Sequence, residues 1–92
     1  MGNRAYFVKE VIYNNQETIN VWQEYDAIAI TFINLHHLDD GTLVSFEGRV
    51  EDIEMALDDD DHGFSSETAT AIRDDIAWVK DNGDGWLRYI CF

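Results

Sequence analysis

Runs of β-branched and aromatic residues predict strands in the first third of the chain. Ala5–Tyr13 is such a run, and the polar segment Asn14–Glu17 that follows it favours a turn. Thr18–Tyr25 alternates apolar and polar positions, so we expect it to pair with the first strand as a hairpin. Ala27–Leu35 is apolar on both faces, which favours another strand, although periodicity alone leaves a buried helix open.

The middle of the chain changes from strand to helix periodicity. Asp40-Gly41 is a hairpin signal, because both central positions of a type I′ turn need positive φ. It would join a strand that ends near Asp39 to a strand over Thr42–Phe46. Apolar residues then recur at helical spacing, which predicts a helix over about Glu47–Asp59. These apolar positions are Phe46, Val50, Ile53 and Leu57.

A second helix and a last strand complete the pattern. Ser65 is suited to cap this helix, and Glu67 is favourable in its first turn. Asn82 and Gly83 end the helix, and its apolar stripe consists of Ala69, Ile72, Ile76 and Val79. Trp86–Phe92 is almost entirely apolar on both faces, so we expect it inside the sheet rather than at an edge.

These elements predict one α+β domain over residues 1–92. Its antiparallel sheet has four to five strands, two helices cover one face, and the final strand is C-terminal. A chain of this length buries only about 60–65% of its unfolded surface, so the core is modest. Some aromatic residues therefore either cover the second sheet face or form a contact surface, which also allows a homodimer. The residues concerned are Phe7, Trp22, Tyr25, Trp78 and Trp86.

The formal net charge is −13, with 19 acidic and 6 basic residues. Nucleic acid and anionic membranes would repel such a surface, whereas a basic protein would be attracted to it. A net charge of magnitude about 2–8 already keeps a small domain soluble, so solubility alone does not explain a net charge of −13. We therefore expect the partner to be a basic, nucleic-acid-binding protein or complex.

Ten of the nineteen carboxylates lie between Asp39 and Asp61, where Arg49 is the only basic residue. Glu47, Glu51, Glu54 and Asp58 are spaced by four, three and four residues, so on a helix they form one stripe. Neighbours along that stripe are about 5–6 Å apart, which is close to the spacing of phosphates along DNA. A solvated helix face is the alternative. The predicted partner-binding residues are Asp39, Asp40, Glu47, Glu51, Asp52, Glu54, Asp58, Asp59, Asp60 and Asp61.

Motifs for catalysis or metal binding are weak. Asp58–Gly63 resembles the start of an EF-hand loop, but Ala69 occupies the position of its bidentate glutamate. His36 and His37 would point to opposite faces of a strand, and Cys91 lacks a neighbouring base in the sequence. We expect no catalytic residue, no metal site and no cofactor, and hence no enzyme.

Three features bear on location. The longest apolar-rich run has nine residues, whereas a membrane-spanning helix needs about 20. A single cysteine cannot form an intramolecular disulfide, which fits a reducing compartment. No apolar stretch follows the first residues, so we expect no secretory signal and a cytoplasmic protein.

In size, acidity and clustering of acids, the chain resembles small phage-encoded inhibitors that mimic DNA, including anti-CRISPR and anti-restriction proteins. The likeness rests on Glu47, Glu51, Asp52, Glu54 and Asp58–Asp61, and it implies no particular fold. It implies a stoichiometric blocker of the nucleic-acid-binding groove of a CRISPR or restriction complex, acting in the cytoplasm of a bacterial host. Two other hypotheses remain: an immunity or antitoxin protein that blocks a basic nuclease, and an ordinary small domain acidified by haloadaptation.

Overall fold

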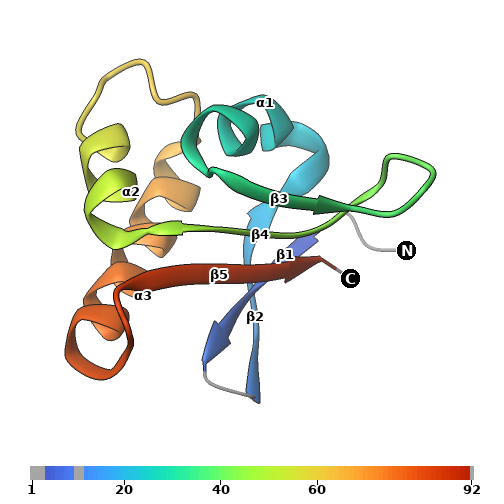
Figure 1. Cartoon of the computed structure of the whole chain (residues 1–92). Coiled ribbons are helices and arrows are strands. Elements are labelled where there is room, and N and C mark those ends of the chain that lie inside the picture. Colours follow the sequence, from blue (N-terminus) through green and yellow to red (C-terminus); the bar gives the residue numbers. More distant parts are fainter. Residues whose placement is uncertain (1–3, 10–11, 92) are drawn as a thin grey trace.

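Five antiparallel strands form one sheet in the computed structural model, which describes the backbone of residues 4–9 and 12–91 and the side chains of residues 4–8 and 17–91. The strand order is β2-β1-β5-β4-β3 (Figure 1). The strands are β1 (Arg4–Lys9), β2 (Ile12–Asn20), β3 (Asn34–His37), β4 (Leu43–Arg49) and β5 (Trp86–Cys91). The α+β prediction is confirmed, and so is the interior position of the C-terminal strand, because β5 pairs with both β1 and β4.

Three helices accompany the sheet, one more than predicted: α1 (Val21–Thr31), α2 (Val50–Leu57) and α3 (Ser66–Asn82). The unpredicted helix is α1, so the strand prediction for Ala27–Leu35 is wrong over most of its length. Val21, Ala27 and Ile28 lie on the buried face of α1, but Trp22 and Ile30 on its exposed face are apolar too. Apolar residues on both faces hide the helical period from the sequence.

The first hairpin is displaced along the sequence. Asn14–Glu17, predicted as a turn, lies inside β2. The predicted strand Ala5–Tyr13 covers most of β1 and the beginning of β2, and its residues Glu10 and Val11 lie outside the described residues. Asn20 ends β2 and starts α1, since its side-chain Oδ1 accepts a hydrogen bond from the Gln23 N–H (3.4 Å). The strand predicted for Thr18–Tyr25 is therefore wrong beyond Asn20.

The β3–β4 hairpin exists as predicted, but its turn is centred one residue earlier. The Leu38 carbonyl accepts a hydrogen bond from the Gly41 N–H (2.9 Å), so Asp39 and Asp40 are the central residues. Gly41 follows them with φ +86°, a conformation that glycine adopts at little cost. This is the pattern of a three-residue hairpin loop rather than of a type I′ turn.

The transition from β4 to α2 occurs at Val50, three residues later than predicted. Glu47 and Gly48 remain in the sheet because they pair with Arg88 and Leu87 of β5. Gly48 packs closely against α2, since a Cβ atom on it would lie 2.9 Å from Ile53 Cδ1 and the Ile53 side chain would have to shift. Sheet pairing therefore outweighs the helical spacing of the segment.

The predicted second helix is confirmed as α3. The Ser65 side chain accepts a hydrogen bond from the Thr68 N–H (3.2 Å), Glu67 lies in the first turn, and Gly83 is the C-cap. The predicted apolar stripe is buried: Ala69, Ile72, Ile76 and Val79. The last predicted residue of the following strand, Phe92, lies outside the described residues.

The core joins the three helices to one face of the sheet, and aromatic side chains occupy its centre. The Tyr89 ring on β5 stacks on Phe46 at 5.1 Å between centroids and contacts Phe7 and Phe32 at 5.7 and 5.8 Å. Its hydroxyl donates a hydrogen bond to Asp75 Oδ2 on α3 (2.8 Å). Burial and the Asp75 carboxylate both raise the pKa of Tyr89, so the phenol stays protonated.

Replacing Tyr89 by Phe should lower the free energy of unfolding by about 1.5–3 kcal/mol, because the buried Asp75 carboxylate loses the shorter of its hydrogen bonds from Tyr89 and Thr18. Tyr25→Phe is the matched control, since the Tyr25 side chain is 36% exposed and should tolerate the loss of its hydroxyl. Urea denaturation followed by circular dichroism measures both. Equal stabilities for the two variants would contradict a structural role for the Tyr89–Asp75 bond.

Candidate protein-binding surface

The ten acidic residues predicted as a partner-binding site do not lie on one patch. Asp39 and Asp40 form the tip of the β3–β4 hairpin, whereas α2 starts at the other end of β4 (Figure 1). Seven residues of strand separate them, roughly 20 Å at the usual rise per residue. The sequence places them in one acidic block, but the extended strand carries them to opposite ends of the molecule.

Glu47 is also separate from α2, because it points across the sheet. Its Oε2 accepts a hydrogen bond from Arg88 Nε (3.0 Å), and its Oε1 accepts one from Asn34 Nδ2 (3.2 Å). Arg88 also forms two hydrogen bonds with the Asp84 carboxylate. These bonds lower the pKa of Asp84 and raise that of Arg88, since each favours the charged form. Glu47 is therefore part of an ion-pair network that ties β3, β4 and β5 together.

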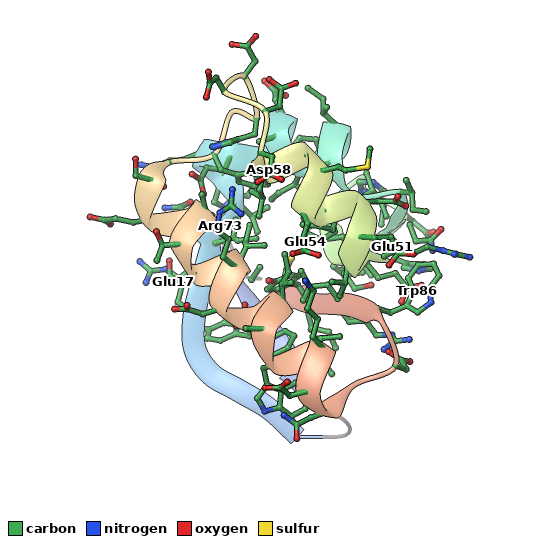
Figure 2. All side chains as sticks on the ribbon, turned by 90° about the vertical axis from the view of Figure 1, so that its left-hand side faces the viewer. Glu17, Glu51, Glu54, Asp58, Arg73 and Trp86 are labelled. Carbon is green, nitrogen blue, oxygen red and sulfur yellow. The ribbon has the colours of Figure 1, made fainter. Side chains whose placement is uncertain are left out.

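The remaining three members of the predicted stripe lie along α2 and at its C-cap: Glu51, Glu54 and Asp58 (Figure 2). Each of them has a basic neighbour. The shortest N–O distances are 3.9 Å for Arg49–Glu51, 2.7 Å for Lys80–Glu54 and 3.2 Å for Arg73–Asp58. Lys80 and Arg73 come from α3, which packs beside α2. The sequence of α2 itself carries no lysine or arginine, so this compensation is visible only in three dimensions.

Part of the unpaired negative charge in the described part of the chain lies on the exposed face of α2 and on the loop that follows it, and the rest lies on α1, on α3 and at the tip of the hairpin. Asp52, Asp60 and Asp61 are exposed, and the ion pairs among the described residues include none of them. Asp59 is exposed too, and its Oδ1 accepts a hydrogen bond from the Asp61 N–H (3.0 Å). We call Glu51, Asp52, Met55 and Asp58–Asp61 the α2 acidic surface.

Met55 gives the α2 acidic surface an apolar centre. Its side chain is 73% exposed, and it lies one helical turn from Glu51 and Asp52. Methionine is enriched at protein interfaces, where an apolar centre is typically surrounded by a polar rim. Met55 was not among the contact residues predicted from the sequence. Its position, as an apolar residue on the polar side of α2, was the signal that indicated a contact.

The aromatic residues divide between core and surface. Phe7 is buried, and Trp78 packs against it with a ring centroid distance of 5.8 Å. Trp86 is half-buried, and the Arg49 guanidinium lies 5.4 Å from its ring centroid. Trp22 and Tyr25 are exposed at 66% and 36%. Two of the five aromatics that appeared surplus in the sequence are thus available for contacts.

Glu24 is a buried carboxylate that the sequence analysis did not single out. It is 8% exposed, and its Oε1 accepts a hydrogen bond from the Ser65 N–H (2.6 Å) at the N-terminus of α3. A carboxylate is favourable at that end of a helix, so this bond joins α1 to α3. Glu24 also borders a polar hollow of about 690 Å³, together with Glu17 and Glu67.

Catalytic and metal-binding groups give few further candidates. The described residues contain no group of three or more His, Cys, Asp and Glu side chains suited to hold a metal ion. His62 is occupied locally, since its Nδ1 accepts a hydrogen bond from the Phe64 N–H (2.9 Å). Burial raises the pKa of Cys91 to about 11, so its side chain is almost entirely the thiol at neutral pH. Among the described helices, none has the length and apolar composition to cross a bilayer.

Comparison with protein families finds no model that matches this chain, and comparisons with curated proteins and with solved structures find no match either.

Neutralising Asp59 should stabilise the fold, because an anion just beyond the C-terminus of α2 opposes the helix dipole. We expect Asp59→Asn to raise the free energy of unfolding by about 0.3–1 kcal/mol at low ionic strength, and by less in high salt. Asp58→Asn is the control, since it also removes the Arg73 ion pair and should gain less. Urea denaturation of both variants measures this, and a destabilised Asp59→Asn variant would contradict it.

Proposed function

We propose that this chain is a non-enzymatic binding protein that docks its α2 acidic surface on the basic groove of a nucleic-acid-binding protein. The observation that carries the proposal is the combination of Met55 and Asp52 on the exposed face of α2 with unpaired carboxylates at Asp59–Asp61 in the loop that follows it. Net charge would speed encounter, and hydrogen bonds between carboxylates and arginine would hold the complex.

The proposed contact is narrower than the one expected from sequence. Asp39 and Asp40 lie at the opposite end of β4, outside the α2 acidic surface, and Glu47 forms an ion pair with Arg88 on the sheet. Glu54 and Asp58 contribute by exchanging Lys80 and Arg73 for basic groups of the partner. Exposed ion pairs are worth only about 0–1 kcal/mol each, so such an exchange costs little.

The nature of the target is a finer proposal, supported by the resemblance to small acidic inhibitors. On this view the target is a CRISPR or restriction complex, the protein is phage-encoded, and it acts in the bacterial cytoplasm by competing with nucleic acid. A basic nuclease toxin is a second class of target that fits the same surface. Both targets hold DNA or RNA in a groove lined by Lys and Arg, which is the feature that the proposal requires.

The test is competition with DNA in a panel of purified CRISPR effector complexes, restriction endonucleases and nuclease toxins. The chain should block DNA binding by one of them, and the inhibition should weaken as salt rises. A variant with Asp52, Asp59, Asp60 and Asp61 changed to Asn should lose at least about tenfold in apparent affinity, since each lost charge-assisted bond is worth about 1.5–3 kcal/mol.

The matched control is a variant with Asp26, Asp39, Asp74 and Asp81 changed to Asn, which removes the same charge from exposed positions outside the α2 acidic surface. It should lose far less inhibition than the first variant. Equal losses in the two variants would show that net charge alone acts. Inhibition that is unchanged in the first variant would refute the assignment of the contact.

Haloadaptation is a second candidate explanation, favoured by the spread of exposed acids over all three helices. Asp26 on α1, Asp52 on α2 and Asp74 and Asp81 on α3 are all exposed. If the acidity serves a high-salt environment, molar KCl should raise the melting temperature by well over ten degrees, because screening relieves the repulsion of a −13 surface. A thermal melt in low and molar KCl measures this, and a shift of only a few degrees would contradict haloadaptation.

A further inference from the structure

A second exposed surface lies on α1, away from the α2 acidic surface. Four large apolar side chains of α1 and the turn after it are open to solvent: Trp22 (66%), Tyr25 (36%), Ile30 (83%) and Ile33 (64%). Trp22, Tyr25 and Ile30 belong to α1, in which the backbone is kinked at Glu24, and Ile33 follows the end of the helix. Leu38 at the start of the hairpin turn is 53% exposed as well. Several exposed apolar side chains in one short segment are a reason to look there for a contact site.

The structure contains a cleft where α1 meets the β3–β4 hairpin. It has a volume of about 260 Å³. Trp22 and Tyr25 border it from the first turns of α1, and Asp40 borders it from the hairpin. Leu43 and Val21 form its floor, since both are buried. The cleft thus combines two aromatic side chains with a carboxylate.

Asp40 is held in place and stays ionised. Its Oδ1 accepts a hydrogen bond from the Thr42 N–H (2.9 Å), and this bond lowers the pKa of the carboxyl. The ion pairs among the described residues do not include Asp40, and no residue that borders the cleft is basic. The negative charge beside the aromatic rings is therefore not compensated from within the described part of the chain.

We propose that this cleft binds an arginine side chain from a basic segment of a partner protein. A planar guanidinium can stack on an indole or phenol ring and pair with a carboxylate at the same time, which a lysine ammonium does less well. The arginine stem would then lie along the apolar side chains of α1. A second copy of this chain is disfavoured as the occupant, because two −13 molecules repel each other.

This site is independent of the proposed function, because it lies at the hairpin end of the sheet and α2 at the other (Figure 1). A partner that spans both ends would explain why Asp39 and Asp40 are acidic although they are remote from α2. The two surfaces can be tested separately, since they share no residue.

The experiment is titration of the isotopically labelled protein with a short oligoarginine peptide, followed by NMR chemical shifts. We expect the largest shifts at the Trp22 indole N–H and at the amides of residues 40–42. Trp22→Ala and Asp40→Asn should each weaken this binding by about fivefold, since the first removes the cation–π contact and the second removes the charge-assisted bond. Both residues are exposed, so both variants should fold.

Three controls make the result decisive. A citrulline peptide of equal length keeps the planar group but lacks the charge, and it should not bind at the cleft; an oligolysine peptide should bind there more weakly than oligoarginine. Asp60→Asn removes one exposed carboxylate on the α2 acidic surface and should leave binding at the cleft unchanged. Shifts confined to Asp58–Asp61, or equal binding by Trp22→Ala, would overturn the proposal. Sedimentation that shows a dimer lost in Trp22→Ala would assign the cleft to a second copy instead.

Discussion

The position of Tyr89 at the centre of the core is the constraint on which the rest of the structure depends. Its ring contacts Phe7 of β1 and Phe46 of β4, and Phe32 at the end of α1. Its hydroxyl reaches Asp75 on α3. One side chain on β5 thus links both halves of the sheet to two helices. Because a buried phenol requires a hydrogen-bond partner, this link also fixes how α3 lies on the sheet.

Scarcity of positive charge is the second constraint. The chain has six basic residues, and of the five whose side chains are described, each lies within 4 Å of at least one carboxylate. Arg49, Arg73 and Lys80 form ion pairs with acidic residues of α2 and its C-cap. Without them these acids would lie close together with no positive charge beside them. The exposed carboxylates that these ion pairs leave out lie on all three helices, on the loop after α2 and at the tip of the hairpin. The two candidate contact surfaces are places where such carboxylates lie beside an exposed apolar side chain.

The sequence predicted most of the second half of the fold, because each signal there agrees with its neighbours. The Ser65 cap, the stripe of α3 and the apolar strand β5 all appear where expected. It failed at α1, where Trp22 and Ile30 are apolar on the exposed face and conceal the helical period. The prediction also placed Glu47 at the start of a helix rather than in β4. Its pairing with Arg88 depends on β5, and Arg88 lies 41 residues further along the chain.

The candidate contact surface, too, could be predicted from the sequence only in part. The exposure of Asp58–Asp61 could be predicted from a polar run after an amphipathic helix. The partition of the acidic block could not, because it depends on β4 being extended. The ion pairs of Lys80 with Glu54 and of Arg73 with Asp58 could not be predicted either, because they depend on the packing of α3 beside α2. The division of the aromatic residues could not be predicted either, since Trp22 is exposed whereas Phe7 belongs to the core.

The central place of β5 has a consequence for how the molecule assembles. Ala5 pairs with Cys91, so closing this part of the sheet brings together residues from almost opposite ends of the described chain. Until that happens, the β1–β2 and β3–β4 hairpins are separate ribbons, each with an unpaired edge that can recruit another molecule. Non-local closure of this kind is slow. The net charge of −13 opposes such association, because half-folded copies of the chain repel one another before β5 is paired.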